Sequence, residues 1–128
     1  MRLLILLAFA LHLSAPIGNA GEVATVKQAR ALMRKHPRTL VLDVRTPREF
    51  DSLHLRGSVN IPLQSKSFID RVKALPNDQS VLIVCARGRR SATAMGLLDS
   101  LGFTKVAHLQ GGLEAWCKAK LPVISAKQ

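Results

Sequence analysis

The chain has 128 residues, a length that fits one domain, and a formal net charge of +11 from 19 basic against 8 acidic residues. Such an excess favours encounters with small anions, acidic surfaces and nucleic acid. The basic residues are dispersed, tyrosine is absent and no aromatic-rich strand is predicted, so we expect no nucleic-acid partner.

The first twenty residues have the pattern of a secretory signal peptide. Arg2 supplies a positive charge, residues 3–11 form an unbroken apolar run, and Gly18-Asn19-Ala20 offers a small-residue cleavage site. An uncleaved anchor and an ordinary helix are the alternatives, but the run is shorter than the roughly 20 apolar residues that a bilayer span requires. We therefore expect cleavage after Ala20, a periplasmic or secreted protein, no membrane span in the mature chain, and one domain over residues 21–128.

Helices and strands are predicted to alternate after this segment. Thr25 is expected to cap a helix that ends at His36-Pro37, because the residue before proline is pushed out of helical space. The nearly all-apolar run 40–44 predicts a strand buried on both faces that carries Asp43 near its end. The tetrapeptide Thr46-Pro47-Arg48-Glu49 has the spacing of a helix start, with the cap, a proline at the first position and a glutamate at the third.

The middle of the chain continues this alternation. Residues 54–62 are expected to be extended, with Gly57 as the turning point, and Ser65 or Ser67 can cap an amphipathic helix. A turn at 76–78 precedes a strand at 81–84 and a helix at 91–101. In that helix we expect Ala92, Met95, Leu98 and Leu101 to face inward, with Gly102 at the C-terminal cap.

The last part of the chain is expected to form a strand at 104–109, a break at Gly111-Gly112 and a helix at 113–120 with Trp116 in the core. The alternating order predicts an α/β fold in which helices cover both faces of a parallel sheet. Sites in such sheets form at the carboxyl ends of the strands, where both Asp43 and Cys85 are expected.

The stretch 81–91, VLIVCARGRRS, carries the clearest chemistry. A buried strand delivers Cys85 into a loop with three arginines, just before a helix begins. Cations and a helix N-terminus lower a thiol pKa, and the thiolate is the nucleophilic form of cysteine. An inert core cysteine is the alternative, but Ala-Arg-Gly-Arg-Arg is an unusual continuation for one. The residues expected to bind an anion are Arg87, Gly88, Arg89, Arg90 and Ser91.

Four segments resemble the rhodanese family of sulfurtransferases. Residues 85–91 are similar to its active-site loop C-x-x-G-x-R-S, and 43–50 to its segment D-V-R-x-x-x-E-F. His54, Gly57 and Asn60-Ile61-Pro62 match H-x-x-G followed by N-I-P, and residues 109–116 match the closing L-x-G-G-x-x-A-W. The resemblance implies a rhodanese-like fold, an open parallel sheet of about five strands with helices on both faces.

The resemblance also implies a reaction. Cys85 would take a sulfur atom from thiosulfate or a similar anionic donor, hold it as a persulfide, and pass it to cyanide or another thiol. Asp43 and Arg45 are supporting candidates: the carboxylate is expected to accept hydrogen bonds from the backbone or from Arg45, with a direct catalytic part as the alternative. No cluster of residues has metal-ligand spacing, so we expect neither a metal nor another cofactor.

Three other functions remain open at this stage. The chain could be a non-catalytic module that carries a persulfide for a protein partner, or a thiol oxidoreductase that uses Cys85 with Cys117. A phosphatase is a further alternative, but related phosphatases have a longer loop, C-x-x-x-x-x-R, and no leaving-group acid can be assigned here. We expect Cys117 to be buried beside Trp116, with a resolving thiol as the alternative, and His54 to hold a turn.

Overall fold

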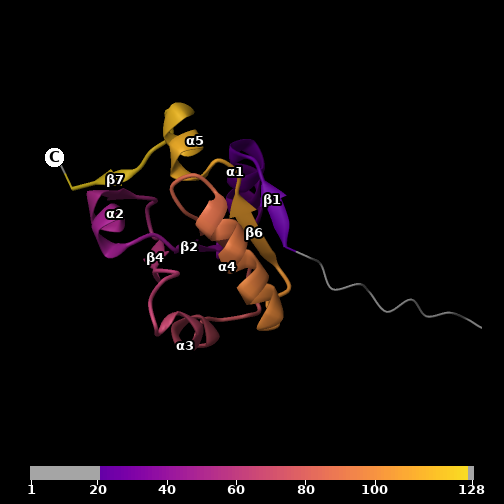
Figure 1. Ribbon diagram of the computed structural model, residues 1–128. Helices are drawn as coiled ribbons and strands as arrows, with labels where there is room; N and C mark the ends of the chain where they lie inside the picture. Colours follow the sequence, from indigo (N-terminus) through magenta and orange to yellow (C-terminus); the bar gives the residue numbers. More distant parts are fainter. Residues whose placement is uncertain (1–20, 127–128) are drawn as a thin grey trace, which may run out of the picture.

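The computed structural model describes residues 21–126, so the predicted signal peptide at residues 1–20 lies outside the described residues. At its centre is a five-stranded parallel sheet in the order β1-β6-β5-β2-β4 (Figure 1). The strands are β1 (Glu22–Ala24), β2 (Leu40–Asp43), β4 (Val59–Asn60), β5 (Val81–Val84) and β6 (Val106–Leu109). This arrangement confirms the predicted α/β fold with an open parallel sheet.

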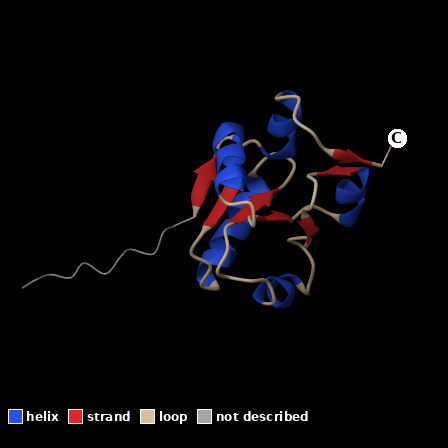
Figure 2. Cartoon of the chain, turned by 180° about the vertical axis from the view of Figure 1, so that it is seen from behind, coloured by secondary structure: helices blue, strands red, loops and turns tan. Residues whose placement is uncertain are grey.

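Helices cover both faces of the sheet, and Figures 1 and 2 show them from opposite sides. The two faces have separate apolar cores because successive side chains of a strand point to opposite sides. On one face, α3 (Phe68–Lys73) and α4 (Arg89–Ser100) pack against Ile83 of β5 and its neighbours. On the other, α1 (Val26–Lys35) and α5 (Gly112–Lys118) pack against Leu82 and Val84. Cys85 continues the row of Ile83 and belongs to the α4 side.

Two helix starts follow the predicted capping pattern. The Thr25 hydroxyl accepts a hydrogen bond from the Gln28 N–H, and the Gln28 side chain accepts one from the Thr25 N–H. Thr46 and Glu49 form the same reciprocal pair at the start of α2 (Pro47–Ser52). Each pair satisfies backbone donors that a helix N-terminus otherwise leaves unpaired. The start of α2 matters most, because Glu49 also reaches the candidate site.

A small antiparallel sheet closes one side of the molecule, beside α2 (Figure 1). It joins β3 (Leu53–His54) to β7 (Ile124–Ser125), so the C-terminal segment is tied to the middle of the chain. His54 stacks on Phe50 with ring centroids 3.9 Å apart, and its Nδ1 lies 2.8 Å from the Phe50 carbonyl oxygen. These contacts join His54 to α2, whereas the following turn is closed by hydrogen bonds from Ser58 to the Leu55 carbonyl oxygen.

Three sequence-based expectations were wrong in detail. The helix predicted at 91–101 begins two residues earlier, at Arg89, and its inward face contains Ala94 while Ala92 is exposed. Cys117 is exposed on α5, although Trp116 beside it is buried as predicted.

Within residues 21–126, no helix has the length and apolar character needed to cross a membrane.

Candidate active site

The candidate site lies where β5 ends and α4 begins. Cys85 follows the last residue of β5 and is only 1% exposed. Gly88 adopts φ +100°, a conformation that favours glycine, and its N–H donates a hydrogen bond to Cys85 Sγ at 3.0 Å. The Ser91 N–H, in the first turn of α4, points at the same sulfur from 3.4 Å. The loop therefore turns backbone N–H groups onto the thiol, an arrangement that binds negative charge.

These contacts decide how readily the thiol ionises. Burial by itself would raise the pKa of Cys85, because a low-dielectric surrounding disfavours the thiolate. Hydrogen bonds from the Ser91 hydroxyl and from the backbone of Ser91, Gly88 and Arg87 act in the opposite direction. The net effect is a pKa of Cys85 below the ordinary value of a cysteine thiol, which increases the nucleophilic fraction at neutral pH.

The sulfur lies at an open hollow of about 500 Å³ lined by arginines. The lining residues are Cys85, Ala86, Arg87, Arg89 and Arg90. Arg87 pairs at 3.1 Å with Glu114 of α5, but 80% of its side chain is exposed, so solvent screens this pair. Among residues 21–126, none forms an ion pair with Arg89. Arg89 is therefore the most available cation for a small anion in the hollow.

Arg90 is held by a carboxylate to which the sequence analysis assigned no role in the site. Its Nη1 and Nη2 donate to Glu49 Oε1 and Oε2 at 2.7 and 2.9 Å. This two-pronged bond lowers the pKa of Glu49 to about 2. The pair joins the loop to α2 and fixes the direction of the Arg90 side chain. Its signal was present in the sequence, since Glu49 belongs to the matched D-V-R-x-x-x-E-F segment.

Two backbone hydrogen bonds join the start of α5 to the Cys85 loop. The Leu113 N–H donates to the Cys85 carbonyl oxygen at 2.8 Å, and the Glu114 N–H donates to the Ala86 carbonyl oxygen at 3.0 Å. Gly112 permits this approach, because a Cβ there would lie 2.5 Å from the same two carbonyl oxygens. Its φ of +60° also favours glycine. Gly112 therefore lets α5 hold the Cys85 loop through these two hydrogen bonds.

Asp43 and Arg45 form a buried ion pair beside the loop rather than in the wall of the hollow. Arg45 Nε and Nη2 donate to Asp43 Oδ1 and Oδ2 at 3.0 and 2.8 Å. The Arg45 N–H also donates to Asp43, which confirms the predicted hydrogen bonding. Arg45 Nη2 reaches the Leu53 carbonyl, and the Asn60 amide donates to the carbonyls of both paired residues. The pair orders the strand ends around the site.

Comparison with known proteins identifies the family of this chain. A family model described as the rhodanese-like domain matches residues 25–119. The chain belongs to this family. The match includes the cysteine loop, the Asp43 segment and the Gly-Gly turn that supports the loop, so it covers every part of the site described above.

Individual relatives of this rhodanese-like domain differ in length. The probable adenylyltransferase/sulfurtransferase MoeZ of Mycobacterium tuberculosis is 32% identical over 102 residues, which cover 80% of this chain but 26% of MoeZ. The thiosulfate sulfurtransferase GlpE of Vibrio cholerae is 34% identical over 98 residues, covering 77% of this chain and 90% of GlpE. A crystal structure of a rhodanese-related protein from Thermoplasma volcanium superposes with a TM-score of 0.71 at 28% identity, covering 80% and 97% of the two chains.

Two further kinds of site were considered within residues 21–126, a disulfide and a metal-binding cluster. Cys85 and Cys117 are both free thiols. Within the described range, 21–126, no three histidine, cysteine, aspartate or glutamate side chains gather so that they could hold a metal ion.

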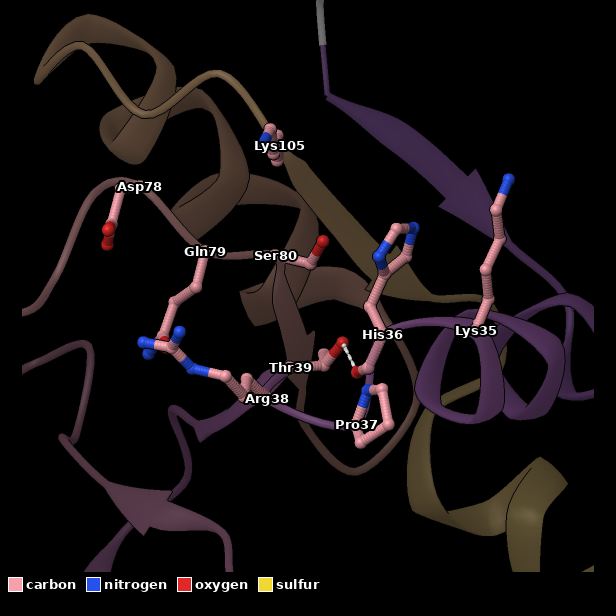
Figure 3. Close-up of a pocket in the computed structure, with 9 residues that line it drawn as sticks. All are labelled: Lys35, His36, Pro37, Arg38, Thr39, Asp78, Gln79, Ser80 and Lys105. Atoms are coloured by element: carbon pink, nitrogen blue, oxygen red, sulfur yellow. Dashed lines mark hydrogen bonds between the residues drawn. The ribbon is translucent and has the colours of Figure 1, made fainter.

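A second hollow lies at the opposite, amino-terminal ends of β2 and β5 and has a volume of about 250 Å³. Figure 3 shows its lining, in which the side chains of Lys35 and Arg38 extend away from each other. The Thr39 hydroxyl donates to the His36 carbonyl oxygen at 2.6 Å, which closes the turn after α1. The lining of this hollow contains no cysteine, whereas Cys85 lines the hollow at the carboxyl ends of the strands.

Proposed function

We propose that this rhodanese-like domain is a thiosulfate sulfurtransferase in which Cys85 carries the transferred sulfur. The observation that supports this most directly is the thiol itself, which receives two backbone N–H groups at the floor of an arginine-lined hollow. The same N–H groups can hold a persulfide, since its terminal sulfur is also an anion. The name of the Vibrio cholerae relative supports thiosulfate as the donor.

The reaction follows a double displacement. The Cys85 thiolate attacks the outer sulfur of thiosulfate, a new S–S bond forms, and the bond to the sulfonate sulfur breaks with its electron pair leaving on sulfite. Cyanide or a thiol then attacks the outer sulfur of the persulfide, and Cys85 leaves as a thiolate. The lowered pKa of Cys85 increases the thiolate fraction, and we propose that this fraction attacks without an external base.

The arginines are assigned different parts. Arg89 has no competing carboxylate within the described chain and is proposed to bind the sulfonate oxygens of the donor. Arg87 can exchange its exposed pair with Glu114 for the donor. Arg90 stays with Glu49 and contributes positive charge from a fixed position. The arginines thus recruit the donor, while the loop N–H groups stabilise the sulfur anion.

Intact mass spectrometry tests the proposal. Incubation with thiosulfate should add one sulfur atom to the protein, and the addition should be absent in Cys85→Ser. Cyanide should then release thiocyanate over many cycles, whereas a non-catalytic carrier would load once and wait for its partner. No adduct with any sulfane donor would overturn the proposal. Cys117 is exposed and does not line the hollow, so the proposed transfer does not need it. Loss of activity in Cys117→Ala would therefore favour the oxidoreductase alternative, which uses both cysteines.

We further propose that the domain is exported. The apolar run at 3–11 and the small residues before Gly21 support a cleaved signal peptide. Expression of the full chain in a bacterium, followed by fractionation, should yield a periplasmic protein whose mass corresponds to a chain starting at Gly21. An unprocessed chain in the cytoplasm would contradict this part of the proposal.

A further inference from the structure

A buried histidine lies next to the reactive thiol without a part in the chemistry derived above. His108 belongs to β6, the strand that pairs with β5, and is only 7% exposed. Its Nδ1 lies 3.1 Å from the hydroxyl oxygen of Ser91, and that oxygen lies 3.4 Å from Cys85 Sγ. Ser91 is fully buried. A chain of contacts therefore runs from the histidine ring through one hydroxyl to the nucleophile.

The number of available protons decides the direction of these hydrogen bonds. The Ser91 hydroxyl has one proton, and it also lies 3.1 Å from the Gly88 carbonyl oxygen. That carbonyl and a thiolate at Cys85 can only accept. If the histidine nitrogen also accepted, three acceptors would share one proton, and two lone pairs would face each other at 3.1 Å. When the ring donates to the hydroxyl, only the thiolate and the Gly88 carbonyl share the hydroxyl proton, and no two lone pairs face each other across the 3.1 Å contact.

The state of the ring agrees with this count. Burial lowers the pKa of His108, so the imidazole is neutral at neutral pH and carries a proton on one nitrogen only. We propose that this nitrogen is Nδ1, and that His108 is a positioning residue which orients the Ser91 hydroxyl to donate to the Cys85 sulfur. This inference rests on the proposed role of Cys85 as a thiolate nucleophile.

The orientation has two effects on the thiolate. A hydroxyl that accepts an N–H donates more strongly through its own proton, because linked hydrogen bonds polarise one another. The N–H also holds Ser91 in the position that reaches the sulfur. Without it, the hydroxyl can satisfy the Gly88 carbonyl alone, as serine often does within the first turn of a helix. His108 therefore lowers the cost of forming the thiolate without touching it.

The test measures the pKa of Cys85 from the ultraviolet absorbance of its thiolate, in a Cys117→Ser background where it is the only thiol. Asparagine and leucine have nearly the same shape, and both fork at Cγ as imidazole does, but only asparagine places an N–H where Nδ1 lies. We expect His108→Asn to leave the pKa of Cys85 near the wild-type value. We expect His108→Leu to raise it by about one unit.

Ser91→Ala shows whether the histidine acts through the hydroxyl. In that background, neither His108 substitution should change the pKa of Cys85. An unchanged pKa in His108→Leu, or equal rises in the Asn and Leu variants, would mean that His108 only fills space and would overturn the proposal.

If the Leu variant does not fold, His108→Gln is used in its place. The glutamine amide extends past the position of Nδ1, so this variant also places no N–H donor there. An unchanged pKa in the Gln variant would likewise overturn the proposal. The titration needs no sulfur donor, so its failure is distinct from a failure of the thiosulfate experiment.

Discussion

Gly112 allows a direct test of how the Cys85 loop is held in place. In Gly112→Ala, the new Cβ would lie 2.5 Å from the carbonyl oxygens of Cys85 and Ala86, where ordinary van der Waals contact begins at 3.4 Å. The loop would have to retreat by about 0.9 Å, the difference between these two distances. Such a movement breaks or stretches the two hydrogen bonds by which α5 holds the loop.

The magnitude can be separated into two parts. An alanine at φ +60° costs about 1–2 kcal/mol of the free energy of unfolding, because its Cβ crowds the backbone. Two weakened hydrogen bonds add about 1 kcal/mol each. Gly57→Ala is the matched control, since Gly57 also has a positive φ, +74°, but has no atom within 4 Å of the added Cβ. We expect a loss of about 3–4 kcal/mol for Gly112→Ala and about 1–2 kcal/mol for the control.

Two assays check this prediction. Urea unfolding gives the stability of each variant. In a Cys117→Ser background, which removes the exposed second thiol, the rate of alkylation by iodoacetamide reports the reactivity of Cys85. We expect alkylation to slow by about tenfold or more in Gly112→Ala, because a shift near 1 Å disturbs the N–H groups around the sulfur. Equal stability losses in the two variants, together with wild-type alkylation, would refute the argument that Gly112 positions the loop.

Three further predictions concern charged residues. Asp43→Ala leaves Arg45 buried without its partner, so urea unfolding should show a loss of about 3–5 kcal/mol, and a loss below 1 kcal/mol would contradict a structural role. Glu49 has its pKa lowered to about 2 from 4.5, so its contribution to stability is complete above pH 4.5 and disappears as the pH falls toward 2. Both partners are about one-third exposed, which limits the contribution to about 1 kcal/mol. Unfolding at pH 6 and pH 3 should therefore show a larger acid loss in the wild type than in Glu49→Gln, and parallel losses would refute the pairing with Arg90. Arg89→Ala should raise KM for thiosulfate by about three- to tenfold with a smaller change in kcat; an unchanged KM would assign the donor to another group.

The central strands were predictable because apolar residues dominate them, with four of four in β5 and three of four in both β2 and β6. The runs around β2 and β5 and the segment ending in β6 have no competing helical period, and all three strands are fully or almost fully buried. The loop chemistry was equally accessible, since Cys85 and its arginines are adjacent in sequence. The strands and the cysteine loop could be predicted from residues that are neighbours in the sequence. The resemblance to the rhodanese family then predicted how these segments are arranged in the sheet.

Short strands could not be predicted in the same way. β1 has three residues, and β3, β4 and β7 have two each, too few to show a period of their own. They are strands because a neighbouring segment offers hydrogen bonds; β7, for example, pairs with a segment about 70 residues earlier in the chain. Such pairing depends on the tertiary fold.

Errors in side-chain placement have a simple geometric cause. A helix turns by about 100° per residue, so a residue beside a buried one commonly faces solvent. This rotation exposes Cys117 next to Trp116 and exchanges Ala92 for Ala94. His108 was overlooked because it lies inside an apolar strand, although a polar residue at such a place needs a hydrogen-bond partner.

The double attachment of Glu49 has a consequence for the surface of the molecule. Its Oε1 accepts from the Thr46 hydroxyl at the start of α2 and from Arg90 in the loop. The six-residue α2 has no buried residue, so its order depends heavily on contacts at its ends. Fraying of α2 would therefore also release Arg90 from its fixed position. Since Arg90 is proposed to stay with Glu49 when the donor binds, amide exchange in residues 47–52 should be unchanged by thiosulfate, and faster exchange would mean that the donor takes Arg90 away from α2.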